Sequence, residues 1–295
     1  MPVYPLMLAS IFVLTIFSLL KYIIVHNYLK KELVHLPANF ISFLSFTLMF
    51  TGPLIIPFFN NQFLYAGKFS STIWHNSTTI FVFPFCVWLF KESLDYLKKP
   101  QVFLWVELIL ISLIIILAKP SFLFAFLIVF PLVCFLKFRW SKWFFFTVFL
   151  SLIILIGIAI EQRLIYDHNP LDKLWYHGET SEIIIAPFKV WLVFAKRPFI
   201  NIICSFLFVI GFIFFKFKAM RHNMEIIYTM SLLAISLSIY FIFAESGPRF
   251  MDGNFYWQVP ISLFLVYMVM IKNIFVPKQN RGGELQFLQV SLISF

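Results

Sequence analysis

Residues 101–142 read QVFLWVELILISLIIILAKPSFLFAFLIVFPLVCFLKFRWSK. Two long apolar runs are separated only by a short turn at 119–121, and the second run ends in a basic group at 137–142. An α-helix of about 20 apolar residues is long enough to cross a bilayer whose hydrocarbon core is about 30 Å thick. The stretch therefore predicts two membrane-spanning helices joined by a tight turn.

The composition of the whole chain extends this prediction. Of its 295 residues, 61% are hydrophobic and 12% are charged, whereas soluble domains have about 45–50% apolar and about 25% charged residues. The net charge of +10 does not indicate a nucleic-acid partner, because the basic residues lie in small groups between apolar runs. We expect an all-α polytopic transmembrane helical bundle, an integral membrane protein with no nucleic-acid partner.

Apolar stretches near the required length recur along most of the chain. We predict a single transmembrane domain at 1–277 with about nine spans, followed by a cytoplasmic tail at 278–295. The expected spans are 5–28, 37–58, 76–97, 101–118, 121–136, 143–160, 199–217, 225–244 and 256–276.

Every second boundary between these spans is basic, and Lys21 is counted with the same side. Positively charged loops stay on the cytoplasmic side of a membrane, so the pattern predicts an N-terminus outside and a cytoplasmic C-terminus. The boundary residues are Lys30 and Lys31; Lys91, Lys98 and Lys99; Lys137, Arg139 and Lys142; Lys216, Lys218 and Arg221; and Lys272, Lys278 and Arg281.

The opposite, outer side then holds three connections, at about 59–79, 161–198 and 245–256. The second is the longest, and long connections often carry function. Within it, residues 183–194 are apolar but too short to span, so we expect them to lie in the membrane interface or to re-enter the bilayer.

Two residue types bear on metal and transport chemistry. Cys86, Cys134 and Cys204 lie inside apolar runs without metal-ligand spacing, which predicts small buried apolar side chains and no metal site. Glu107 is the one acid well inside an apolar run. We expect it to pair with Lys99 or to reach the interface, with a proton relay as the alternative.

Polar residues on the outer side form four groups, and the first two lie at helix boundaries. His75 and Asn76 precede the third span, where they either cap and anchor a helix or line an outward cavity that favours anions. Lys119 either completes a two-helix turn or contacts a lipid phosphate. Arg197, at the end of the long connection, is a plausible phosphate contact.

The last outer connection holds Glu245, Arg249 and Asp252 together with Gly247, Pro248 and Gly253. Glycine and proline mark tight turns. The segment is therefore either a tight polar turn or a binding loop in which Glu245 and Arg249, four residues apart, can pair.

Three segments, 73–78, 118–122 and 245–255, together resemble a group of bacterial multi-spanning proteins allied to the GT-C glycosyltransferases. The resemblance implies a GT-C-like bundle in the bacterial inner (plasma) membrane. It also implies sugar transfer from a polyprenyl-phosphate donor at the outer leaflet during envelope glycan assembly. In GT-C proteins a carboxylate of the first outer loop usually acts as base or metal ligand. Residues 59–79 contain no Asp or Glu, so no catalytic acid is carried over to that loop.

The leading hypothesis is a glycosyltransferase-like protein that acts on lipid-linked sugars, with membrane lipid and a polyprenyl-phosphate-linked sugar as partners. Carboxylates would deprotonate the acceptor, and cations with neighbouring polar groups would hold phosphate. The proposed catalytic residues are Glu245 and Asp252, and the proposed phosphate-binding residues are His75, Asn76, Lys119, Arg197 and Arg249.

Two other functions fit the sequence. One is a transporter or flippase, which should show charged or broken helices at mid-membrane, and the other is a non-catalytic subunit of an assembly complex. The sequence leaves open whether the protein is an enzyme, and it names no cofactor, sugar or acceptor.

Overall fold

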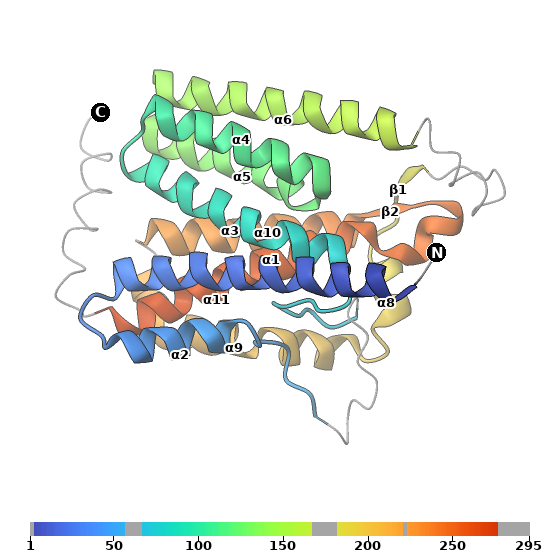
Figure 1. The fold of residues 1–295 in the computed structure, drawn as a ribbon, viewed down its shortest axis with the longest axis horizontal. Helices are drawn as coiled ribbons and strands as arrows, with labels where there is room; N and C mark the ends of the chain where they lie inside the picture. Colours follow the sequence, from blue (N-terminus) through green and yellow to red (C-terminus); the bar gives the residue numbers. More distant parts are fainter. Residues whose placement is uncertain (1–2, 57–66, 167–181, 221–222, 277–295) are drawn as a thin grey trace.

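The computed structural model describes residues 3–56, 67–166, 182–220 and 223–276. It is a bundle of long helices that run roughly parallel or antiparallel to one another, with two very short strands at one end (Figure 1). The long elements are α1 (Val3–Glu32), α2 (Ala38–Leu48), α3 (Ser77–Lys98), α4 (Val102–Ala118), α5 (Ser121–Phe138), α6 (Lys142–Tyr166), α9 (Pro198–Met220), α10 (Met224–Ile242) and α11 (Gln258–Phe275). The short elements are β1 (Ile183–Ile185), α8 (Lys189–Phe194), β2 (Phe243–Glu245) and the 3₁₀ turns η1 (Gly247–Asp252) and η2 (Asn254–Tyr256).

The predicted all-α bundle is confirmed. Among the described residues, six helices are long and apolar enough to cross a membrane, whereas α2 and α4 are shorter apolar helices. Large apolar side chains such as Phe12, Leu117 and Phe214 are exposed, as expected of a surface that faces lipid. These helices indicate an integral membrane protein, and the number of spans stays a prediction.

The second predicted span, 37–58, is wrong in its extent. Helix α2 ends at Leu48, and the chain continues without regular structure through Gly52 and Pro53. Proline lacks a backbone N–H, and glycine is costly in a helix interior. The freed carbonyl of Thr51 instead accepts hydrogen bonds from the hydroxyls of Ser71 (2.9 Å) and Thr72 (2.7 Å).

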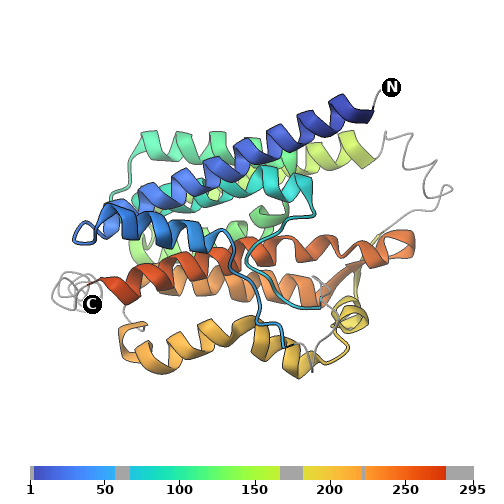
Figure 2. The ribbon, with the colours of Figure 1, turned by 60° about the horizontal axis from the view of Figure 1, so that its bottom comes forward.

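The segment that supplies those hydroxyls is a buried loop, residues 67–73, which lies within the outer connection predicted at 59–79. All seven of its residues are buried, and it runs between α11 and α9 (Figures 1 and 2). Its backbone is paired with neighbours, because the N–H of Phe69 donates to Ser205 Oγ (2.9 Å) and the hydroxyl of Tyr256 donates to the carbonyl of Lys68 (3.3 Å). Irregular backbone at membrane depth requires such partners. Residues 59–66 lie outside the described residues.

The short elements cover this loop. Strand β1 pairs antiparallel with β2, with Ile184 opposite Ala244, and α8 follows. The predicted connection at 161–198 thus begins inside α6 and ends in a strand and a helix, while 167–181 lies outside the described residues. Trp191 of α8 is buried, and its indole N–H donates to the carbonyl of Gly67 (3.3 Å).

Successive long helices alternate in direction, which separates two ends of the bundle. One end, which we call the basic end, is where α1, α3, α5 and α11 finish, with the predicted basic boundaries around Lys31, Lys98 and Lys137. The other, which we call the strand end, carries β1, β2 and α8 (right in Figure 1). The predicted tail at 278–295 lies outside the described residues.

Gly67 gives a direct test of the buried loop. A Cβ at this position would collide with the backbone carbonyl of Phe194 in α8, whereas a Cβ on Gly211 of α9 would meet nothing within 4 Å. We predict that Gly67→Ala lowers the free energy of unfolding by about 1–3 kcal/mol. Gly211→Ala should be neutral or stabilising by up to about 1 kcal/mol, because alanine is the better helix former. Equal thermal unfolding midpoints for the two variants would contradict this packing.

Candidate functional site

Asn76 organises a polar cluster at the strand end. It precedes the first residue of α3 with extended backbone, and its side chain accepts a hydrogen bond from the backbone N–H of Thr79 (2.9 Å). The predicted helix cap is therefore present. The same Oδ1 accepts from the hydroxyls of Thr78 (2.9 Å) and Thr79 (2.8 Å) and from Lys119 Nζ (3.2 Å).

Lys119 reaches this cap from the turn between α4 and α5. Its ammonium group lies 4.5 Å from the centre of the Trp257 ring, in a cation–π contact. Burial lowers the pKa of Lys119 to about 8. The ring of His75 lies 5.6 Å from that of Trp257, and burial together with the Lys119 charge lowers the pKa of His75. The imidazole is therefore neutral at pH 7 beside a charged lysine.

We call His75, Asn76, Thr78, Lys119 and Trp257 the Lys119 cluster. It combines a partly desolvated cation, an aromatic ring face and several hydroxyl and amide groups. A desolvated ammonium binds an anion more strongly than a solvated one does, because less water competes. Binding sites for polar ligands often combine an aromatic wall with a few placed polar groups. The arrangement suits a ligand that joins an anionic group to a polar ring.

The second group lies in the chain that links α10 to α11. The Glu245 carboxylate ends β2 and accepts a hydrogen bond from Asn254 Nδ2 (2.6 Å). Burial raises the pKa of Glu245, the nearby Asp252 raises it further, and Asn254 and Arg249 oppose this change. Glu245, Arg249 and Asn254 line one small cleft with Tyr240. We call Glu245, Arg249, Asp252 and Asn254 the Glu245 loop.

The two groups are adjacent along the chain. Asn254 begins η2, which ends at Tyr256, and Trp257 follows it with helical backbone and directly precedes α11. Residues three apart in helical backbone have side chains about 5–6 Å apart. The hydrogen-bond partner of the Glu245 carboxylate therefore lies one turn from the ring that contacts Lys119.

The structure thus gathers the predicted site residues into two neighbouring groups. His75, Asn76 and Lys119 lie in the Lys119 cluster, and Glu245, Arg249 and Asp252 lie in the next loop. Arg197 comes from elsewhere at the strand end, the turn between α8 and α9, where its side chain is exposed.

Sequence reasoning missed the part that Trp257 and Asn254 take in the site. Trp257 was not among the predicted site residues. Asn254 already lay inside the segment 245–255, so the same motif contained the signal for it. Among the described residues, no group of three His, Cys, Asp or Glu side chains is placed to hold a metal ion, and the three cysteines are buried.

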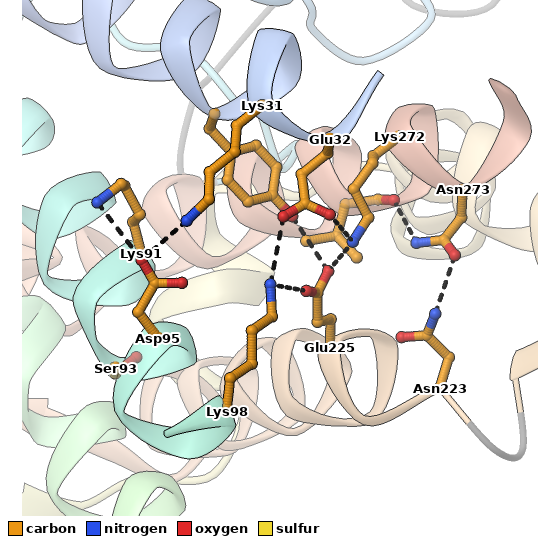
Figure 3. A network of polar contacts seen from close by, with 12 residues as sticks. Lys31, Glu32, Lys91, Ser93, Asp95, Lys98, Asn223, Glu225, Lys272 and Asn273 are labelled. Carbon is orange, nitrogen blue, oxygen red and sulfur yellow. Dashed lines mark hydrogen bonds and ion pairs between the residues drawn. The ribbon is translucent and has the colours of Figure 1, made fainter. Parts of the chain in front are cut away.

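A third polar group, at the basic end, was not predicted (Figure 3). Lys98 Nζ lies 3.2 Å from Glu32 Oε1 and 3.3 Å from Glu225 Oε1. Lys272 Nζ contacts Glu225 and lies 3.5 Å from Glu32 Oε2. The hydroxyl of Tyr28 also donates to Glu225 (3.1 Å). We call Glu32, Lys98, Glu225 and Lys272 the ion cluster. It joins α1, α3, α10 and α11.

The sequence signal for the ion cluster was present but spread over four helix ends. Each of its residues is ordinary at a loop boundary, and only the fold brings them together. The pairing expected between Glu107 and Lys99 is absent from the part of the chain that the structure describes, where Glu107 forms no ion pair. The buried acids that form ion pairs among the described residues are Glu225, with Lys98 and Lys272, and Glu92, with Lys91.

With this geometry established, comparisons with known proteins add no assignment: no family model, no curated protein and no solved structure matches the chain. The resemblance to GT-C glycosyltransferases therefore still depends on its three motif segments.

The ion cluster predicts a large effect of single substitutions. Glu225→Gln or Lys272→Met leaves the ion cluster with one uncompensated charge, so each should lower the free energy of unfolding by about 3–5 kcal/mol. The double variant should lose less than the sum, because neither charge is then stranded. The control is Lys31→Met, whose exposed pair with Asp95 contributes about 0–1 kcal/mol. The free energy of unfolding of the wild type and of all four variants can be measured in mixed micelles. If Glu225→Gln lowers it no more than Lys31→Met does, the stabilising role of the cluster is refuted.

Proposed function

We propose that the protein is a membrane glycosyltransferase that transfers a sugar from a polyprenyl-phosphate donor to an acceptor at the strand end. The observation that carries this proposal is the adjacency of the Lys119 cluster and the Glu245 loop. A cation and an aromatic ring face lie one helical turn from the partner of a carboxylate whose pKa is raised. Phosphate binding and proton removal thus have separate, neighbouring groups.

The chemistry follows from these groups. Lys119 and Arg249, with the exposed Arg197 nearer the surface, supply positive charge for the donor phosphate, and the ring of Trp257 faces the sugar. The acceptor hydroxyl attacks the anomeric carbon, a new C–O bond forms, and the bond from that carbon to the phosphate oxygen breaks. The lipid phosphate leaves with the electron pair. The hydroxyl proton passes to the Glu245 carboxylate, whose raised pKa makes it a better base.

The remaining site residues have supporting parts in this proposal. Asp252 lies in the same loop, and its charge raises the pKa of Glu245. It can also serve as the base itself for an acceptor hydroxyl that binds closer to it. Asn76 positions Lys119 through their hydrogen bond. His75, neutral at pH 7, offers a hydrogen bond without adding charge.

The positive-inside pattern supports placing the strand end outside. The basic boundaries lie at the opposite end of the bundle, and lysine and arginine near span ends are retained on the cytoplasmic side. We therefore propose a bacterial inner-membrane protein whose transfer site faces the outer leaflet. Polymers of the cell envelope are assembled there from lipid-linked sugars.

A flippase or transporter is the second candidate. Such a protein should carry a charged group at mid-membrane, and Lys21 of α1 is a buried lysine between helices. A flippase would move the lipid-linked sugar without breaking the sugar–phosphate bond. A non-catalytic subunit would show neither activity alone and would copurify with a synthase.

A transfer assay tests the proposal. Proteoliposomes containing a radiolabelled polyprenyl-phosphate sugar and an acceptor should yield labelled product. Lys119→Met and Glu245→Ala should each lower the rate at least about 100-fold, the usual loss when an acid–base or oxyanion-type group is removed. Lys189→Met and Glu182→Ala, matched exposed residues of the strand end, should keep the wild-type rate.

Two outcomes contradict the proposal. Full transfer by Lys119→Met and Glu245→Ala would place the active site elsewhere. Movement of intact donor across the membrane, without product, would favour the flippase.

A further inference from the structure

Lys21 lies inside the bundle and not at the basic end, where the sequence pattern had counted it. It belongs to α1 and is only 8% exposed. Its ammonium group lies 4.2 Å from the ring centre of Phe83 in α3 and 4.7 Å from that of Phe264 in α11. Within the described residues it has no other polar contact, neither a carboxylate nor a hydrogen-bond acceptor.

This environment leaves a charge without a counter-ion. A buried ammonium group is costly unless it is paired and hydrogen-bonded. Two aromatic faces offset part of that cost by cation–π attraction, but they accept none of its three N–H groups in an ordinary hydrogen bond. The ion cluster shows the contrast, since Lys98 and Lys272 each contact two carboxylates. Lys21 therefore has the features of a site whose anion comes from outside the chain.

The position of Lys21 relates this site to the Lys119 cluster. Phe264 lies seven residues after Trp257 on α11, which is close to two full turns, so the two rings share one face of the helix about 10 Å apart. On α3, Phe83 likewise lies seven residues after Asn76. Lys21 and Lys119 therefore occupy the same seam between α3 and α11, with Lys21 two turns deeper.

The depth of Lys21 favours a lipid over an ion from water. Helix α1 exposes apolar side chains along its length, including Phe12 (68%) and Leu19 (55%), so it forms an outer wall of the bundle that faces lipid. Lys21 follows Leu19 by two residues, about 200° around the helix, so it lies on the opposite, inward face of α1. A lipid anion would therefore reach it by entering between α1 and the neighbouring helices, with its hydrocarbon tail left in the bilayer.

We propose that Lys21 binds the phosphate group of a membrane-embedded lipid, as a second cationic site beneath the Lys119 cluster. That this lipid is the sugar donor rests on the proposed function: its phosphate would meet Lys21 first, with its polar head directed toward Lys119 and Trp257. Lys21 is a binding residue in this scheme and does not touch the reacting atoms.

Direct binding tests the site without requiring transfer. The protein is placed in nanodiscs of zwitterionic lipid, and native mass spectrometry measures binding of a polyprenyl monophosphate and of the matching polyprenol. The wild type should bind the monophosphate at least about ten-fold more tightly than the alcohol. These variants are made in protein that already carries Lys119→Met, so that Lys21 is the remaining lysine of the seam; there Lys21→Met should abolish that preference, and Lys21→Arg should keep it because the charge remains.

Two further arms define the ligand and the role of the lysine. Competition by inorganic phosphate at similar concentration would identify a free anion as the source, whereas failure to compete identifies the lipid. Lys21→Met should not lower the thermal unfolding midpoint, because it removes an uncompensated buried charge. A Lys21→Met protein that unfolds at a lower temperature and still prefers the monophosphate would show a packing role only and would overturn the proposal. If the wild type has no transfer activity but Lys21→Met removes the lipid preference, the binding site stands and only the proposed function is refuted.

Discussion

Charges and backbone polar groups that leave water must find partners, and this requirement applies at both ends of the bundle. At the basic end, two lysines and two glutamates from four helices neutralise one another. At the strand end, the buried loop 67–73 satisfies its polar groups through Thr51, Ser205 and Tyr256. Lys21 is the described ammonium group for which the same requirement is met only by aromatic rings.

The two ends consequently differ in what they offer to a ligand. In the ion cluster every charge already has an opposite charge nearby, so the cluster ties helices together and leaves little potential for a substrate. At the strand end, burial shifts the pKa of Lys119, His75 and Glu245 away from their ordinary values. Such shifts are typical of functional sites. We therefore propose that the strand end carries the chemistry and that the ion cluster at the basic end holds the helices together.

Hydropathy predicts the helices because it sums a property of consecutive residues. It therefore predicted most helix ends to within a few residues. The cap at Asn76 could also be predicted, because capping depends only on residues next to one another in sequence. Hydropathy predicted too long a helix for α2, because it does not take into account that Gly52 and Pro53 disfavour helical backbone. It did not show that 67–73 is buried, because Thr51 and Ser205, which satisfy the polar groups of this loop, are distant in sequence. The ion cluster and the contact between Lys119 and Trp257 join residues far apart in sequence, so no local pattern contains them.

We propose that the strand end faces outside and that the basic end faces the cytoplasm, and the proposed transfer site depends on this orientation. Single cysteines at Asp252 and Lys99, both exposed and at opposite ends of the bundle, test it against a low background because the three native cysteines are buried. Cells carrying Asp252→Cys should react with a membrane-impermeant maleimide while intact, and cells carrying Lys99→Cys should react only after permeabilisation. The reverse result, with Lys99→Cys labelled in intact cells and Asp252→Cys protected, would contradict the account.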